Sequence, residues 1–186
     1  MVNQMVRIGI ISDTHIRGDA AGIPPQIFEA FAEVDLILHC GDVYSLSVLD
    51  RLEAICPVLA VRGYADPKTN EPRLDGPTRI VTIGGIRIGM IHHINWPGPR
   101  LEKMNGALEF PPEPMVEVMK RKFGSPVDVV VFGDSHEELV VSHEGVLFVN
   151  PGSPLYPGVR HRTGDLGTVA ILSISEGAVN AEIMQL

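Results

Sequence analysis

The sequence predicts an α/β domain in which two β-sheets pack face to face, with helices on their outer sides. Two observations lead to this fold class. Strand-like and helix-like segments alternate over the first third of the chain, which is typical of a parallel sheet with crossover helices. Paired strand-like segments joined by tight turns dominate the rest, which favours antiparallel hairpins. The chain has 186 residues, which suits one domain with a substantial core, so residues 1–186 are treated as a single domain.

The first third is predicted to contain three strands separated by two helices. Val6–Ile11, Asp35–Cys40 and Val58–Val61 are short and mostly apolar, as expected of strands buried on both faces of a parallel sheet. Pro24–Val34 has apolar residues at nearly helical spacing, and its two prolines suit a first helical turn. Ser45–Ile55 is predicted as the second helix, and its first residue is a suitable N-cap.

The remaining two thirds are predicted to form three hairpins and one further helix and strand. Gly84-Gly85 separates Thr78–Ile83 from Ile86–His92, which is a strong signal for a two-residue turn. Pro114–Phe123 predicts a short helix, and Val127–Phe132 predicts another buried strand. The other two hairpins are expected from Glu138–Ser142 with Val146–Val149, and from Gly167–Ser173 with Ala178–Met184.

A long segment without periodicity separates the first hairpin from the third predicted helix. It is rich in proline and glycine. A loop of this length inside a compact domain more often has a function than none. We therefore interpret Asn95–Pro111, which carries Trp96, as a lid or specificity loop.

Composition and charge limit the classes of function. The chain is 45% hydrophobic and 20% charged, as in a globular protein. It has no apolar run long enough to cross a bilayer and no secretory signal, so we expect a cytoplasmic protein without a membrane partner. The formal net charge of −8 and the lack of a basic tract argue against a nucleic-acid partner. Cys40 and Cys56 are expected to be reduced thiols, a disulfide being the alternative.

Four of the predicted buried strands end in side chains that could bind a metal ion. Ligands of open α/β sheets gather at the carboxyl ends of the strands. Asp and His suit divalent ions, and a carboxylate can bridge two of them. One such motif alone is usually a turn with a capping Asp, but four in one short chain predict a metal site. The candidate ligands are Asp13, His15, Asp42, His92, Asp134 and His136.

The order D-x-H, G-D, a single His and G-x-x-H resembles the calcineurin-like metallophosphoesterase superfamily. Ala60-Val61-Arg62-Gly63 and Asn150-Pro151-Gly152-Ser153-Pro154 look more narrowly like the YfcE-like phosphodiesterases of bacteria and archaea. The resemblance covers the chain from Ile8 to the last strand. It implies a four-layer αββα sandwich of two mixed sheets. It also implies two divalent ions, usually manganese (with iron, zinc, nickel or magnesium as alternatives), and hydrolysis of phosphodiesters or monoesters by a metal-activated hydroxide.

The resemblance also implies how the two ions are held. One ion would be bound by Asp13, His15, Asp42 and His136. The second would share Asp42 as a bridge and would use His92.

The sequence departs from the family at two ligand positions of the second ion. Tyr64 stands where the family has an Asn, while Asp66 keeps the acidic position of the same motif. Tyr64 could ligate through its phenol oxygen, fill the place of the ion, or pack as the pocket floor. Asp134 stands where the family has a His, and we favour a metal-binding role for it. Asp42, Asp66 and Tyr64 are the candidate catalytic residues.

Charge counting shows why these departures matter. Two divalent ions with Asp13 and Asp42 leave a net charge of +2, and Asp134 lowers it to +1. One ion with all three carboxylates would leave −1, which would repel a phosphate. Hydrolysis therefore requires both ions, or a neutral or displaced Asp134.

Residues beside the ligands are expected to support them. His93 is interpreted as a supporting or packing group, and His39 is expected to orient Asp42 by a hydrogen bond. Asn150-Pro151-Gly152-Ser153 predicts a tight turn near the metal ions.

Three functions stay open at this point. The first is an active phosphoesterase with a small phosphate-ester substrate. The second is a phosphoesterase fold that has lost catalysis and serves as an interaction module, for which a retromer subunit with this fold is a precedent. The third, a nuclease acting on nucleic-acid ends, is disfavoured by the net charge. A homo-oligomer is a further possibility on which the sequence gives no information.

Overall fold

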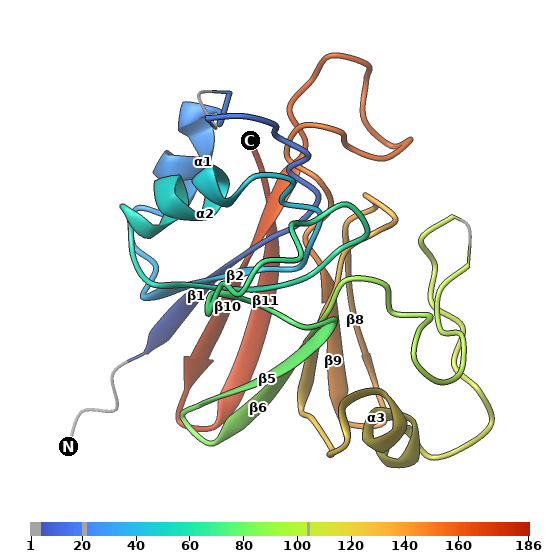
Figure 1. The fold of residues 1–186 in the computed structure, drawn as a ribbon. Coiled ribbons are helices and arrows are strands. Elements are labelled where there is room, and N and C mark those ends of the chain that lie inside the picture. Colours follow the sequence, from blue (N-terminus) through green and yellow to red (C-terminus); the bar gives the residue numbers. More distant parts are fainter. Residues whose placement is uncertain (1–4, 20–21, 104) are drawn as a thin grey trace.

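The computed structural model describes residues 5–19, 22–103 and 105–186, which form two mixed β-sheets (Figure 1). In the first sheet, neighbouring strands do not all follow one another along the chain, and the sheet contains both parallel and antiparallel pairs. Its strands, in spatial order, are β11 (Ala178–Gln185), β10 (Thr168–Ser175), β1 (Val6–Ile11), β2 (Leu36–His39), β3 (Val58–Val61) and β4 (Leu74–Asp75).

The second sheet is also mixed. Its strands, in spatial order, are β5 (Thr78–Ile83), β6 (Ile86–Ile91), β7 (Val129–Val131), β9 (Val146–Asn150) and β8 (Leu139–His143). The pairs β5–β6, β8–β9 and β10–β11 are antiparallel, which confirms the three predicted hairpins. The pairs β1–β2 and β2–β3 are parallel, as the alternating first third predicts.

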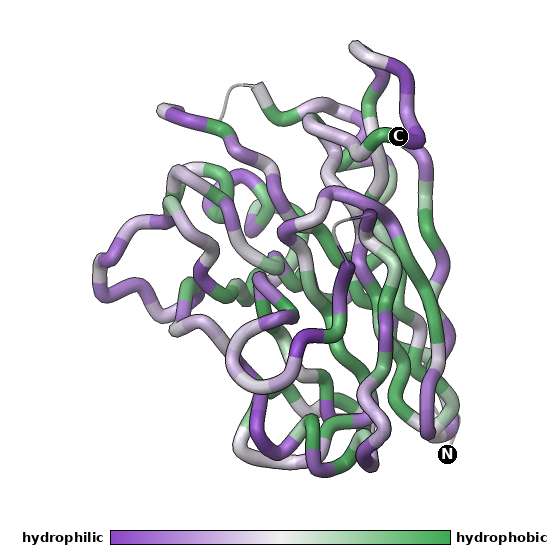
Figure 2. Tube along the Cα trace, turned by 90° about the vertical axis from the view of Figure 1, so that its right-hand side faces the viewer, coloured by the Kyte–Doolittle hydropathy of each residue, from purple (hydrophilic) through white to green (hydrophobic). Residues whose placement is uncertain are grey.

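The predicted four-layer αββα sandwich is confirmed. α1 (Pro25–Ala30) and α2 (Leu46–Glu53) pack on the first sheet, and α3 (Met115–Phe123) packs on the second. Between the sheets lies a core to which both contribute, for example through Ile10 and Met90. Figure 2 shows that the hydrophobic residues follow the strands through the interior, while the loops are more hydrophilic. Burial of this apolar surface is the main force that holds the layers together.

Each sheet carries a glycine where an aromatic ring from the helical layer crosses it. A Cβ atom at Gly9 of β1 would lie 2.8 Å from the ring of Phe31. A Cβ atom at Gly89 of β6 would lie 2.8 Å from the ring of Phe123. The missing side chains therefore allow both rings to pack directly on the strand backbone.

The structure corrects three details of the predicted elements. The first helix ends at Ala30 rather than Val34, because Phe31 already leaves the α-helical conformation (φ −101°, ψ 10°). Ser45 occupies the N-cap position of α2, but its hydroxyl donates to the carbonyl of Gly18 at 2.6 Å instead of capping the helix. The two-residue strand β4 was not predicted, because so short a segment has no readable period.

The long loop after β6 is held to α3 by a buried lysine. The Nζ atom of Lys122 donates to the carbonyl oxygens of Ile94, Pro97 and Pro99 at 2.6, 2.8 and 2.9 Å. Burial lowers the pKa of Lys122 to about 8. Residue 104 of this predicted lid lies outside the described residues.

Two further expectations concern the cysteines and membranes. Cys40 and Cys56 are both free thiols, Cys40 being buried and Cys56 half-buried. No helix in the described part of the chain is long and apolar enough to cross a membrane.

Candidate metal centre

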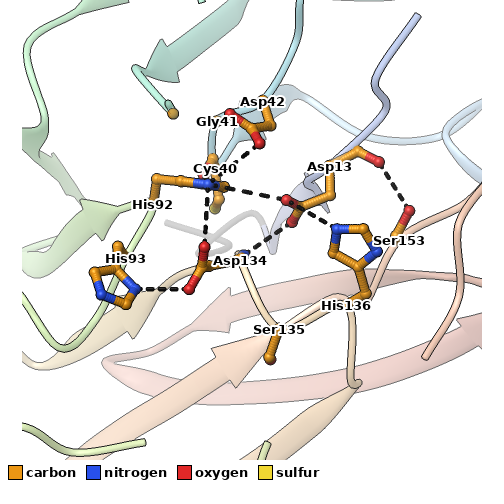
Figure 3. A network of polar contacts seen from close by, with 12 residues as sticks. Asp13, Cys40, Gly41, Asp42, His92, His93, Asp134, Ser135, His136 and Ser153 are labelled. Carbon is orange, nitrogen blue, oxygen red and sulfur yellow. Dashed lines mark hydrogen bonds and ion pairs between the residues drawn. The ribbon is translucent and has the colours of Figure 1, made fainter. Parts of the chain in front are cut away.

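The carboxyl ends of β1, β2, β6 and β7 bring the six predicted ligands together, and Figure 3 shows most of them converging. Five of the six have a left-handed backbone conformation, which is uncommon for residues other than glycine. Such a conformation persists only where the surrounding structure enforces it, and it is frequent at functional sites. These residues are Asp13 (φ 53°), His15 (49°), Asp42 (53°), Asp134 (75°) and His136 (61°).

Asp13, His15 and His136 form a first group of possible ligands whose donor atoms lie within 4.8 Å of one another. The Nε2 atoms of the two histidines are 3.1 Å apart. Asp13 Oδ1 lies 3.5 Å from Nε2 of His136 and 3.8 Å from Nε2 of His15. Donors around one ion with bonds of ~2.1 Å lie roughly 3.0–3.4 Å apart, so this group is close to the size that an ion requires.

Asp13, Asp42 and His92 form a second group within the same limit. His92 Nε2 lies 3.7 Å from Asp42 Oδ2 and 4.0 Å from Asp13 Oδ1. Asp13 is therefore common to the two groups, and Asp42 Oδ2 also lies 3.8 Å from His15 Nδ1 of the first group. The bridging role that the family resemblance implied for Asp42 stays a prediction. Spacing along the sequence identifies which carboxylates reach the site, but it does not show which of them lies in the middle.

Two donor atoms at the centre are buried without a hydrogen-bond partner among the described residues. They are Asp13 Oδ1 and His92 Nε2. A buried polar atom without a partner costs about 1–3 kcal/mol, so such atoms are rare in folded proteins. Bound divalent ions would satisfy both atoms, and the donor set therefore fits the metal ions that the family resemblance implies.

Hydrogen bonds to the other ring nitrogens direct the Nε2 lone pairs toward the centre. Nδ1 of His92 donates to the carbonyl of Cys40 at 2.8 Å. Nδ1 of His136 donates to the carbonyl of Tyr156 at 2.6 Å. Metal-binding histidines typically have such partners, because these fix the ring orientation and the tautomer.

The electrostatic environment favours the protonation states that a metal ion needs at Asp13 and His15, but not at His136. Burial acts to lower the pKa of His136, but the Asp13 carboxylate outweighs this effect and raises it overall. Burial acts to raise the pKa of Asp13, but His136 and His92 outweigh this effect and lower it overall. Burial lowers the pKa of His15, although Asp13 and Asp42 partly oppose the shift. An ionised carboxylate and a neutral imidazole are the forms that bind metal ions.

Asp134 lies beside the second group and is tied to His93. Its Oδ2 atom is 2.6 Å from His93 Nδ1, and its Oδ1 atom is 3.7 Å from His92 Nε2. One oxygen is therefore used by His93 and the other faces the possible ion, which agrees with the supporting role predicted for His93. The backbone amide of Asp134 also donates to Asp13 Oδ2 at 3.0 Å.

Tyr64 stands on the rim of the centre rather than on its floor. Its side chain is 67% exposed, and its ring meets the ring of His92 edge-on at a centroid distance of 5.3 Å. Desolvation and the nearby Asp134 carboxylate raise the pKa of Tyr64 to about 12. The exposed position rules out the pocket-floor interpretation.

Asp66 and His39 support the loops that carry the ligands. Asp66 accepts hydrogen bonds from the backbone amides of Tyr44 and Gly63, both at 2.8 Å, so both of its oxygens are occupied. This gives Asp66 a positioning role. His39 accepts a hydrogen bond from the Gly41 amide and contacts the Thr14 hydroxyl, so it does not hold Asp42 directly as the sequence suggested.

The predicted turn after β9 contacts the metal-binding loops. The Ser153 hydroxyl donates to the carbonyl of Asp13 at 2.8 Å. The Asn150 side-chain amide donates to the carbonyl of Gly133 and to the Ser135 hydroxyl, both at 3.1 Å. The turn therefore holds the first and last ligand segments together.

Sequence reasoning missed one acidic residue near the centre, Glu102 of the long loop. Asn95 fixes its backbone, since the Asn95 Oδ1 atom accepts the Glu102 amide at 2.7 Å. Burial raises the pKa of the Glu102 carboxyl to about 7; the hydrogen bond from Ser135 opposes this shift, and Asp134 adds to it. A lone Glu in a segment without period carries no signal that could have identified it.

We expect Glu102 to make the metal-free protein less stable as the pH rises from about 4.5 to about 7. In this window the unfolded chain has lost the Glu102 proton while the folded chain retains it. The loss is on the order of 2 kcal/mol, allowing for partial access of solvent. Glu102→Gln should remove this pH dependence from urea unfolding curves.

Glu109→Gln is the matched control, because Glu109 lies in the same loop with a 69% exposed side chain. The control should keep the wild-type pH dependence. A Glu102→Gln protein that also keeps it would contradict the assignment.

Comparison with known proteins places this site in a family. Residues 6–177 match the model of the calcineurin-like phosphoesterase superfamily domain. The chain belongs to this superfamily. The family placement predicted from the motifs is thereby confirmed, and the structure contains groups of Asp and His side chains that could hold metal ions.

Two relatives in the superfamily are similar over most of the chain. A probable metallophosphoesterase of Methanocaldococcus jannaschii is 36% identical over 152 residues, which are 81% of this chain and 69% of that protein. A probable metallophosphoesterase of Methanothermobacter thermautotrophicus is 32% identical over 180 residues, which are 96% of this chain and 91% of that protein.

The same fold is also found in a solved structure of a protein that is not named as a phosphoesterase. Vacuolar protein sorting 29 of Cryptosporidium parvum has a TM-score of 0.67 at 20% identity, with 98% of both chains covered. At this identity the likeness shows the fold alone.

Proposed function

We propose that the chain hydrolyses small phosphate esters, phosphodiesters or monoesters, at a centre of two divalent ions. The observation that carries the proposal is a pair of buried donor atoms, Asp13 Oδ1 and His92 Nε2, that have no partner in the described part of the chain and belong to two groups that share Asp13. Divalent ions in such a site supply Lewis-acid activation of the ester and of water. We propose manganese as the physiological ion and the cytoplasm as the location.

The protein residues have separate tasks in this proposal. Asp13 lies between the two groups and accepts the Asp134 amide, so its position is fixed before any ion binds. His15 and His136 complete the first group, and Asp42 and His92 complete the second. The hydrogen bonds that orient His92 and His136 reduce the reorganisation needed on binding.

The function is tested by removing all metal, reloading with manganese and measuring hydrolysis of bis(p-nitrophenyl) phosphate. We expect two ions per chain by mass spectrometry and hydrolysis that depends on both. A folded protein with two bound ions that hydrolyses neither this diester nor p-nitrophenyl phosphate, with any divalent ion, would refute the proposal.

Tyr64 supports a second candidate function, an interaction module without catalysis. Its ring lies against His92, whose Nε2 atom is closed to solvent, and the Asp134 carboxylate is close enough to raise the pKa of Tyr64. The fold shared with vacuolar protein sorting 29 makes a non-catalytic role physically plausible, because one fold can carry unrelated functions.

We expect Tyr64→Asn to bind the second ion about ten-fold more tightly, since the amide adds a neutral ligand and opens access to His92. Metal titration with a chelating indicator measures this affinity. Tyr64→Phe keeps the ring and removes the hydroxyl, so its affinity should stay close to that of the wild type. If both variants lose the second ion, the phenol oxygen is itself a ligand.

A further inference from the structure

A cavity of about 830 Å³ opens directly beside the metal centre. Its inner wall is the segment 134–137, which carries Asp134 and His136. Its outer wall comes from the loop between β9 and β10, which rises beyond the ends of the strands (Figure 1). The size is within the range of sites for small organic molecules, and an ester held at the metal centre would extend into it.

The outer wall is tied to the metal-binding segment. The amide of Val159 donates to Glu137 Oε1 at 2.8 Å, and the amide of Gly158 donates to the carbonyl of His136 at 3.0 Å. A Cβ atom at Gly158 would lie 2.3 Å from the Glu137 carboxyl carbon, so only glycine allows this approach. The cavity is therefore formed before a ligand binds, which lowers the entropic cost of binding.

All three tyrosines of the chain surround the metal centre. The rings of Tyr44 and Tyr156 lie 4.7 and 5.3 Å from the ring of His15, and that of Tyr64 lies 5.3 Å from the ring of His92. Tyr156, which lines the cavity, is 53% exposed. About half of Tyr156 is therefore open to a ligand that enters the cavity.

The rest of the cavity suits an uncharged, planar group near the metal centre. Leu155 and Pro157 lie beside Tyr156 in the lining. His161 is paired with Glu138, whose Oε2 atom lies 3.1 Å from His161 Nε2. Arg162 and Asp165 lie in the lining at exposed positions and bring opposite charges. The inner wall adds two carboxylates, each with a partner: Arg160 Nε lies 3.5 Å from Glu137 Oε2, and His93 Nδ1 lies 2.6 Å from Asp134 Oδ2. The charged groups of the lining are therefore paired with protein groups rather than arranged to select an ionic group.

We propose that this cavity binds a planar aromatic group of the ester substrate, stacked on the ring of Tyr156. The proposal rests on the phosphoesterase function proposed above and assigns its substrate class, phosphate esters with an aryl or nucleoside group next to the phosphorus. Stacking on tyrosine gives such a group an advantage over an alkyl group of about ten-fold in affinity.

Binding of two phosphonates tests the cavity without turnover. Calorimetry on the manganese-loaded protein compares phenylphosphonate with methylphosphonate, and we expect a ratio of dissociation constants of about ten in favour of the phenyl compound. Tyr156→Leu, which removes the ring but keeps apolar bulk, should lower the ratio below about two, whereas Tyr156→Phe should keep it. Val140→Ala, a control on the edge strand β8, should leave it unchanged.

Equal affinity for the two phosphonates in protein with its full complement of ions would overturn the proposal. So would a ratio that survives Tyr156→Leu. Thermal unfolding of each variant verifies that the comparison is made on folded protein. Because the ratio is a binding measurement, it remains readable even if no ester is hydrolysed, and that result would refute the phosphoesterase function separately.

Rates of hydrolysis then show whether the aromatic group that the cavity binds is a simple aryl group or part of a nucleoside. Methyl, phenyl and thymidine 5′-esters of 2,2,2-trifluoroethyl phosphate share a leaving group that is not aromatic and differ only in the group that is retained. A higher kcat/KM for the phenyl than for the methyl ester supports an aryl subsite, and a still higher value for the thymidine ester assigns it to nucleotides. Equal values for all three esters contradict the proposal.

Discussion

Replacing Asp13 by Asn is expected to abolish binding of both metal ions and to lower kcat/KM by on the order of 10³-fold or more. Asp13 belongs to both ligand groups, and its Oδ1 atom is buried without a partner among the described residues. The amide of Asn can still accept the Asp134 hydrogen bond, so the fold should persist. The loss therefore comes from the missing negative charge of a residue that belongs to both groups.

The number of ions bound per chain, measured by mass spectrometry, decides between Asp13 and Asp42 as the shared ligand. We expect Asp13→Asn to lose both ions and Asp42→Asn to lose only the one beside His92. Asp128→Asn is the matched control, because Asp128 immediately precedes β7, at the opposite end from Asp134. If Asp42→Asn loses both ions and Asp13→Asn loses one, the bridge that the family resemblance implied is correct.

Most of the fold could be predicted from the sequence, because its elements are marked by local signals. The hairpin β5–β6 is an example, since both residues of its turn, Gly84 and Gly85, have positive φ angles that glycine adopts readily. The buried strands were visible as short apolar runs. The end of α1 was not, because Phe31 continues the apolar period of the helix after the backbone has left the helical conformation.

The candidate site was predictable to the level of residues but not of geometry. Asp and His residues at strand ends indicate where ligands gather, and the structure brings all six together. Which carboxylate lies between the two groups depends on how the two sheets face each other, which spacing along the chain does not encode. The pairing of Asp134 with His93 joins segments 41 residues apart and was likewise invisible.

The altered residues at the second ion also change how the charge of the centre is counted. Asp134 adds a carboxylate, but one of its oxygens contacts His93 and the other faces His92. His93 therefore takes up part of this charge, and less of it is directed at the ion. Tyr64 and Asp134, the two departures from the family, interact with each other, since the Asp134 carboxylate contributes to the raised pKa of Tyr64.

The second large effect is expected from Gly63→Ala, which should destabilise the protein by about 3 kcal/mol and displace Asp42. A Cβ atom at this position would lie 2.1 Å from Asp42 Oδ1 and 2.4 Å from its backbone nitrogen. A backbone atom cannot move aside as a flexible side chain can. The hydrogen bond from the Gly63 amide to Asp66 Oδ2 further limits how far residue 63 can shift.

Urea unfolding gives the stability, and the number of bound ions reports the displacement of Asp42. Gly76→Ala is the matched control, because no atom lies within 4 Å of a Cβ there and the Gly76 carbonyl accepts the amide of Arg62, the residue before Gly63, at 3.0 Å. We expect Gly76→Ala to change the free energy of unfolding by less than about 0.5 kcal/mol and to keep both ions. A Gly63→Ala protein as stable as this control, with both ions bound, would show that Asp42 does not need the close approach seen here. We expect instead that Gly63→Ala loses the ion beside His92. This loss would show that Gly63, which supplies no ligand atom, is as necessary to the centre as the Asp42 carboxylate for which it leaves room.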